Sequence, residues 1–273
     1  MRKGPSWFNV VSITLGFVFL YLPILLLVVY SFNESRLVTV WAGFSTKWYG
    51  EMLRNQALMD AAWVTVRVAL LSASVATVLG TLGAVTLTRF GRFPGRTMFS
   101  GMIYAPLVMP DVILGLSLLL MFVAVGLDRG FWTVVLAHTT FTMCYVAVVV
   151  QSRLVAFDRD LEEAAMDLGC PPMKTFFLIT LPIILPAVVA GWMLAFTLSL
   201  DDLVIASFAT GPGATTLPMK IYSQVRLGVT PEINAVSTVL IVIVTIGVII
   251  ASVTTKRQEV ARQKAERMAA AAP

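Results

Sequence analysis

The chain has 273 residues, of which 58% are hydrophobic and only 13% are charged, and its formal net charge is +5. About a quarter of the residues in a soluble domain are usually charged. The deficit is concentrated in long stretches without any charge, which a soluble protein would have to bury completely as helices. The composition therefore argues against a soluble domain. The two cysteines have no metal-ligand spacing and give neither a disulfide framework nor a metal site.

The first apolar run begins at Val10 and ends at Tyr30. It is too long for the core of a signal peptide, and no small-residue cleavage site follows it, so it predicts a retained membrane helix. Further charge-free runs of roughly 20 residues are long enough to cross a hydrocarbon core of about 30 Å. Together the runs predict an all-α membrane protein with transmembrane helices at 10–31, 63–88, 97–125, 131–151, 183–207 and 233–255.

The placement of basic residues predicts the orientation of these six helices, because Lys and Arg are enriched in cytoplasmic segments. If the N-terminus, with Arg2 and Lys3, lies inside, the inside segments hold most of the 20 Lys and Arg residues. Both termini are therefore expected in the cytoplasm. The stretch 256–273 is charged and rich in alanine, and we interpret it as a cytoplasmic tail.

The longest and most polar inside loop joins the fourth and fifth predicted helices. Helix-forming residues with acids near the start occupy 163–168, and such acids suit the positive N-terminal end of a helix. Gly169 is placed as a helix stop. The pattern predicts a short helix that ends at Gly169, followed by an amphipathic segment over 173–180. Physical reasoning leaves two interpretations open, an interfacial helix without a partner and a docking element for a soluble partner.

This loop resembles the "EAA" loop in permease subunits of bacterial ATP-binding-cassette importers. That family's pattern is EAA, three residues, G, nine residues, I, one residue and LP. The sequence matches it with the spacing intact at Glu163, Ala164, Ala165, Gly169, Ile179, Leu181 and Pro182.

The resemblance implies that 163–169 docks in a cleft of a separate ATPase subunit. It also implies a type I importer fold, with one N-terminal helix and its periplasmic loop in 1–59 and a core of five helices in 60–255, which includes the EAA loop at 162–182. The sequence contains no GxxxxGK[ST] loop for nucleotide phosphates. ATP is therefore expected to bind a partner subunit, and this chain is expected to be a transport subunit without catalytic residues, a metal or a cofactor of its own.

Three carboxylates lie within predicted membrane helices, where a charge costs roughly 2.5–3.5 kcal/mol. At about 1.5 Å per residue, Asp111 lies roughly 21 Å and Asp201 roughly 27 Å from the inner ends of their helices. Similar depths on two helices suggest a cation site open to the outer side. Adjacent helical residues point about 100° apart, so one of Asp201 and Asp202 is expected to line the path and the other to pair with a backbone group or another subunit. The alternatives are that Asp111 caps a restarted helix and that the pair lies at the headgroup boundary.

The stretches 106–112 and 199–208 look like those of polyamine permeases, and the whole chain is similar to the putrescine-type permease. This resemblance implies an importer in the bacterial inner membrane with two different permeases, two copies of an ATPase and a periplasmic polyamine-binding protein. It also implies that Asp111, Asp201 and Asp202 guide the cation. Putrescine rather than spermidine rests on the resemblance alone. The expected surroundings are membrane lipid, and no nucleic acid partner is expected.

Other functions remain open. A permease of the same family for another solute, such as a metal cation, fits the acids, whereas an oxyanion site would need Arg, Lys or helix N-termini. A cation carrier or channel independent of ATP also fits the acids but does not need the EAA loop. A membrane enzyme would need a cluster of reactive groups. His138 is the only histidine and lies in an apolar run, so we expect it to be packed or hydrogen-bonded.

Overall fold

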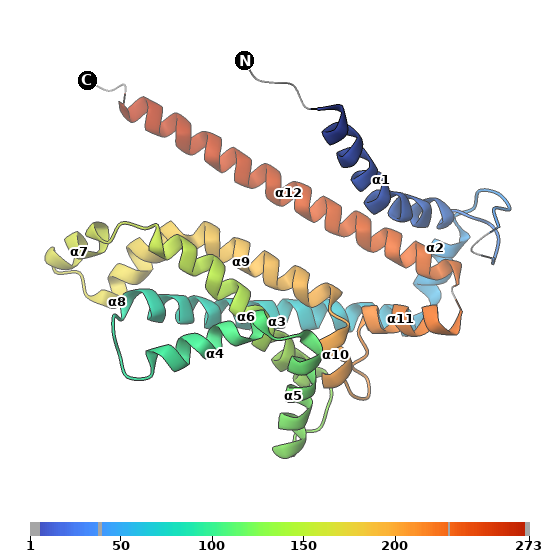
Figure 1. The fold of residues 1–273 in the computed structure, drawn as a ribbon, viewed down its shortest axis with the longest axis horizontal. Coiled ribbons are helices and arrows are strands. Elements are labelled where there is room, and N and C mark those ends of the chain that lie inside the picture. Colours follow the sequence, from blue (N-terminus) through green and yellow to red (C-terminus); the bar gives the residue numbers. More distant parts are fainter. Residues whose placement is uncertain (1–5, 38–39, 229, 271–273) are drawn as a thin grey trace. The chain divides into compact units, whose positions relative to one another are not determined.

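The computed structural model describes residues 6–37, 40–228 and 230–270, so Arg2, Lys3 and 271–273 lie outside the described residues (Figure 1). The described part is helical between its loops, and its only bridge of β type joins Asn33 and Phe44. It divides into two compact units. One contains 57–223, and the other contains 1–56 and 224–273.

Three long helices form the body of the unit 57–223. They are α3 (Gln56–Arg89), α6 (Phe131–Val155) and α9 (Leu181–Asp201). Small residues let them approach closely, as is common between membrane helices. A Cβ at Gly80 would lie 2.6 Å from the carbonyl oxygen of Met143. The close packing of α3 against α6 therefore requires glycine at position 80.

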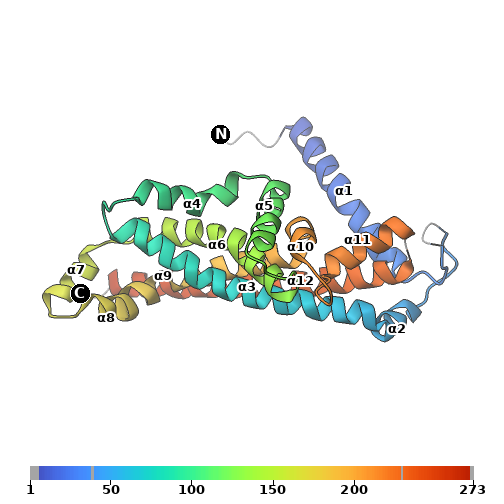
Figure 2. The same cartoon turned by 90° about the horizontal axis from the view of Figure 1, so that it is seen from below.

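The predicted third span, 97–125, is wrong as one straight helix. It is divided into α4 (Arg96–Val108) and α5 (Asp111–Ala124), which are bent by 120° (Figure 2). Pro110 has no backbone N–H and pushes the preceding residue towards an extended conformation, which Met109 adopts with φ −74° and ψ 137°. The depth predicted for Asp111 assumed a single helix axis and therefore does not hold.

The predicted fifth span, 183–207, is also divided differently. It begins earlier, with α8 (Pro172–Thr175) and a π-helical segment η1 (Phe176–Thr180), and α9 ends at Asp201. The chain then restarts as α10 (Val204–Ala209). Both α5 and α10 follow a break in a predicted span, and they pack against each other. Gly115 of α5 leaves room for the ring of Phe208 in α10.

The predicted short helix in the EAA loop is confirmed as α7 (Asp160–Asp167). Its end is a Schellman motif, in which the backbone N–H of Gly169 bonds the carbonyl of Met166 at 2.9 Å and that of Cys170 bonds Ala165 at 3.0 Å. Gly169 has φ +87°, which glycine adopts without strain. The helix therefore ends at Gly169, as the sequence predicted, because glycine adopts the left-handed conformation that this ending needs.

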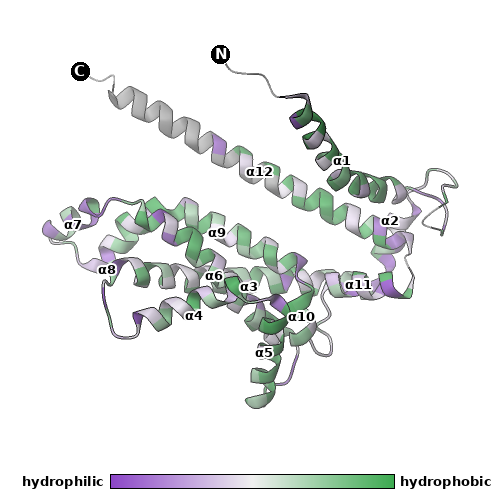
Figure 3. Cartoon of the chain, in the orientation of Figure 1, coloured by the Kyte–Doolittle hydropathy of each residue, from purple (hydrophilic) through white to green (hydrophobic). Residues whose placement is uncertain are grey.

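The other unit contains α1 (Trp7–Tyr30), α2 (Lys47–Arg54) and α12 (Pro231–Ala270), and α11 (Leu217–Leu227) crosses the boundary between the units. No described side chain of α1 is buried, although the helix is mainly hydrophobic (Figure 3). Such a helix needs an apolar environment outside its own chain.

Among the described residues, four helices are long and apolar enough to cross a membrane, or five if α4 and α5 count as one broken span. The apolar part of α12 over 231–247 is shorter than a full span. The all-α membrane architecture is therefore confirmed, whereas the count of six transmembrane helices stays a prediction.

Candidate functional site

The two adjacent acids at the end of α9 have different environments. Asp202 lies in the break between α9 and α10, where one carboxylate oxygen accepts from the backbone N–H of Ala206 at 2.7 Å and the other from Ile205 at 3.3 Å. An acceptor side chain at this place satisfies donors that the first turn of a helix leaves free. Asp202 therefore caps α10, and its side chain is only 9% exposed.

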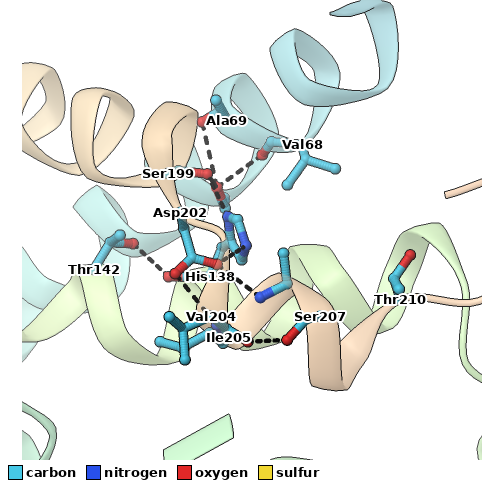
Figure 4. Close-up of polar contacts among 12 residues, drawn as sticks. Val68, Ala69, His138, Thr142, Ser199, Asp202, Val204, Ile205, Ser207 and Thr210 are labelled. Atoms are coloured by element: carbon cyan, nitrogen blue, oxygen red, sulfur yellow. Dashed lines mark hydrogen bonds and ion pairs between the residues drawn. The ribbon is translucent and has the colours of Figure 1, made fainter. Parts of the chain in front are cut away.

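His138 connects this cap to the centre of the helix bundle (Figure 4). The imidazole is fully buried, and its Nε2 lies 3.2 Å from Oδ2 of Asp202, within the range of an ion pair. Its Nδ1 lies 2.6 Å from the hydroxyl of Ser199, which in turn lies 3.0 Å from the hydroxyl of Ser72. The expectation of a packed, hydrogen-bonded histidine is confirmed.

This network joins four segments of the chain, namely α3, α6, α9 and the start of α10. Polar groups are costly inside an apolar core unless they are paired, so the network holds these segments in one mutual arrangement. The sequence analysis did not predict the roles of Ser72 and Ser199. The signal that could have found them is the presence of single polar residues in otherwise apolar runs.

Asp201, in contrast, is the last residue of α9 and its side chain is exposed. The structure thus supports the expectation that the two neighbours differ, with Asp202 pairing inside the protein and Asp201 facing outwards from it. Asp111 is also exposed, at the first position of α5. Both exposed acids therefore lie at places where a predicted membrane span is broken, which leaves their carboxylates available to a cation.

The aromatic residues close to these acids in the sequence are used in packing. Trp192 and Phe196 stack on each other at 5.3 Å between ring centroids, and the indole N–H of Trp192 donates to the hydroxyl of Ser74 at 3.2 Å. The hydroxyl of Tyr104 donates to Gln151 of α6. These contacts favour the interpretation of the three aromatics as packing residues.

The EAA pattern is divided between α7 and the base of the fifth span, where η1 meets α9. Glu163 and Ala164 are exposed on α7, Ala165 is half-buried there, and Gly169 ends the helix. The remaining fixed positions lie at the base of the fifth span, which places them at the end of η1 and in the first turn of α9. These positions are Ile179, Leu181 and Pro182.

Glu162, which precedes the pattern, is turned the other way. Its Oε2 lies 2.9 Å from Nε of Arg89, the last residue of α3, and its Oε1 accepts from the hydroxyl of Thr180 at 2.6 Å. No role of Arg89 or Thr180 was predicted from the sequence. Glu162 therefore attaches α7 to two spans at once.

The chain is similar to several known proteins. The family model described as "Binding-protein-dependent transport system inner membrane component" matches residues 76–259. The chain is 60% identical to the putrescine transport system permease protein PotI of Escherichia coli K12, with 86% of each chain covered. It is 46% identical to the spermidine/putrescine transport system permease protein PotC of the same strain, with 85% of this chain and 88% of PotC covered.

Solved structures have the same fold. A chain of a bacterial ABC transporter involved in the import of alginate matches with a TM-score of 0.68 and 15% identity, over 91% of this chain and 98% of that one. A chain of the MetNI methionine ABC transporter matches with a TM-score of 0.60 and 21% identity, over 73% of this chain and 93% of that one.

Proposed function

Because the chain belongs to the family of binding-protein-dependent transport system inner membrane components, we propose that it is the permease subunit of an ATP-driven importer for polyamines. The observation that carries this conclusion is its 60% identity to a putrescine permease over 86% of both chains. The protein is a transport component of the inner membrane, not an enzyme, and putrescine is the expected main substrate.

The partners follow from the same membership. The importer is expected to contain a second, homologous permease, two copies of an ATPase that binds the nucleotide, and a periplasmic protein that delivers the polyamine. We further propose six membrane spans with both termini in the cytoplasm, since this orientation places α7 on the same side as the ATPase. The exposed apolar surface of α1 is then covered by lipid or by a neighbouring subunit.

Within the permease, we assign the polyamine path to the exposed carboxylates. An ammonium group can bind Asp201 without breaking any contact that holds the fold, whereas binding at Asp202 would compete with the cap of α10 and with His138. Asp111 provides a second carboxylate at the other broken span. In this proposal Asp202 fixes the positions of α10 and His138 beside the path, and Asp201 and Asp111 bind the substrate.

ATP drives the cycle by favouring one conformation of the permease. The closed ATPase pair binds α7 better in one state of the membrane helices than in the other, and this difference in affinity shifts the equilibrium. The exposed residues Glu163 and Ala164 form the face of α7 that docks on the ATPase.

Uptake of radiolabelled putrescine by cells with and without this gene tests the proposal. Uptake should depend on the gene, stop after ATP depletion, and persist in the presence of excess spermidine. Gene-dependent uptake that survives ATP depletion would identify a carrier or channel instead. If spermidine competes fully, the substrate range is that of a general polyamine importer, and if no uptake depends on the gene, the polyamine assignment is wrong.

A further inference from the structure

We propose that Glu162 is the positioning residue through which movement of α7 reaches α3 and α9. The inference rests on the proposed function, because it concerns how the ATPase drives the permease. The EAA loop joins α6 to α8, so the chain itself connects α7 only to the fourth and fifth spans. The second span, α3, is reached solely through side chains, and Glu162 provides such a connection with its bond to Arg89.

The connection to α3 is tightly held. Arg89 and Glu162 have side chains that are only 14% and 13% exposed, and Nε and Oε2 lie 2.9 Å apart. The guanidinium of Arg89 also lies over the ring of Phe157 at 5.5 Å, and Phe157 belongs to the linker that precedes α7. An ion pair that is largely shielded from water in this way is screened much less by solvent and salt than a fully exposed one.

A second cation from the same linker reaches the end of α3. Arg159, immediately before α7, donates to the carbonyl oxygen of Thr88 at 3.0 Å. Cations suit the C-terminal end of a helix because they satisfy its free carbonyls. Arg159 and Glu162 therefore contact the last two residues of α3 from either side of the start of α7, so a displacement of α7 must displace this end of α3.

The connection to α9 meets an irregular part of the chain. Thr180 is buried, and it is the last residue of the π-helical segment η1, directly before α9. π-helical turns within longer helices are frequently found at functional sites. Glu162 accepts from Thr180 at 2.6 Å, so the carboxylate holds the base of α9 at the residue where its hydrogen-bond pattern changes.

The two neighbouring glutamates thus have opposite tasks. Successive residues of a helix point about 100° apart. Glu163 is exposed and available to the ATPase, whereas both oxygens of Glu162 are occupied by the permease. We infer that Glu163 belongs to docking and Glu162 to transmission, so that loss of Glu162 separates ATP hydrolysis from transport while the subunits remain assembled.

The test uses the complete importer in vesicles, with Glu162→Gln in this chain. Glutamine keeps an oxygen for Thr180 but loses the charge opposite Arg89. We expect the ATPase to co-purify as before, while stimulation of ATP hydrolysis by the putrescine-loaded binding protein falls at least tenfold and more ATP is consumed for each putrescine imported. Asp160→Asn, which removes an exposed acid of the same helix, serves as the control and should leave both quantities unchanged.

A charge exchange, Glu162→Arg with Arg89→Glu, separates this role from a general loss of structure. It should restore at least half of the lost stimulation. Three results would overturn the proposal. ATP hydrolysis in Glu162→Gln could be stimulated normally, this variant could lose the bound ATPase, or the exchange variant could be as impaired as Glu162→Gln. A complex of unchanged chains that does not import putrescine with ATP would instead contradict the proposed function.

Discussion

Oδ2 of Asp202, in the break between α9 and α10, lies 3.2 Å from Nε2 of His138 in α6, while the adjacent Asp201 is exposed. One acid of the pair thereby contributes to the fold, whereas its neighbour is exposed, which is what the proposed role of Asp201 in the polyamine path requires. Adjacent acids in a membrane span are thus not equivalent. This relationship makes the roles of the two acids separable by mutation.

Asp201→Asn should weaken transport without impairing assembly. A hydrogen bond between the carboxylate and the ammonium group of the substrate contributes about 1.5–3 kcal/mol to binding. Its loss corresponds to roughly a 10- to 100-fold weaker apparent affinity. The measurement is the concentration dependence of putrescine uptake. Asp202→Asn is the matched comparison and should lower the amount of folded permease. Equal uptake by Asp201→Asn and the unchanged chain would remove Asp201 from the path.

His138→Ala should destabilise the permease, because it leaves the Asp202 carboxylate and the Ser199 hydroxyl without their shared partner. Removing one partner of a buried polar group typically costs about 1–3 kcal/mol. Thermal unfolding of the detergent-solubilised protein, followed by size-exclusion chromatography, measures the effect. Thr140→Val is a suitable control, since this exposed hydroxyl bonds only within its own helix, to Leu136. Similar melting temperatures for both variants would show that the network is not important for stability.

Gly80→Ala should also destabilise the fold, for a steric reason. The added methyl group would lie 2.6 Å from the carbonyl oxygen of Met143 and 2.8 Å from Cβ of Val146, so α3 and α6 must separate. Overpacking of this kind costs about 1–3 kcal/mol. Gly101→Ala provides the comparison, because nothing lies within 4 Å of its added Cβ. The same thermal assay applies, and a melting temperature no lower than that of Gly101→Ala would contradict the packing described here.

Glu163→Lys should prevent stable binding of the ATPase, because it reverses a charge on the exposed face of α7. The expected result is loss of the ATPase during purification through a tag on the permease, with the permease itself still folded. Asp167→Lys makes the same change at another exposed position of α7 and controls for charge reversal as such. Retention of the ATPase by Glu163→Lys would move the docking face elsewhere.

The sequence predicted what depends on local patterns. The length of an apolar run determines whether a helix can cross a membrane, and Gly169 ends α7 because the left-handed conformation is favourable for glycine. The bend at Pro110 was harder to predict, because proline permits a bend, but its angle of 120° depends on how α5 packs against α10. Sequence reasoning therefore found the long apolar helices and α7, but neither the division of the third span nor the direction of α5.

The pairs that define the site are distant in the sequence. His138 and Ser199 are 61 residues apart, and Ser72 and Ser199 are 127 residues apart. No periodicity within one helix can reveal such pairing. For this reason the sequence predicted that one of the two adjacent acids pairs with a backbone group or another subunit but could not identify which one. In the structure Asp202 is the acid that accepts from backbone N–H groups.

The place of Asp201 at the very end of α9 has an energetic consequence. The carbonyl groups of the last turn give a helix a partial negative charge, which repels a nearby carboxylate by about 0.3–1 kcal/mol at low ionic strength. An ammonium group bound there is attracted by the carboxylate and by the helix dipole together. If Asp201 binds the polyamine as proposed, the permease without substrate carries a small electrostatic penalty at this residue, and a bound cation relieves it.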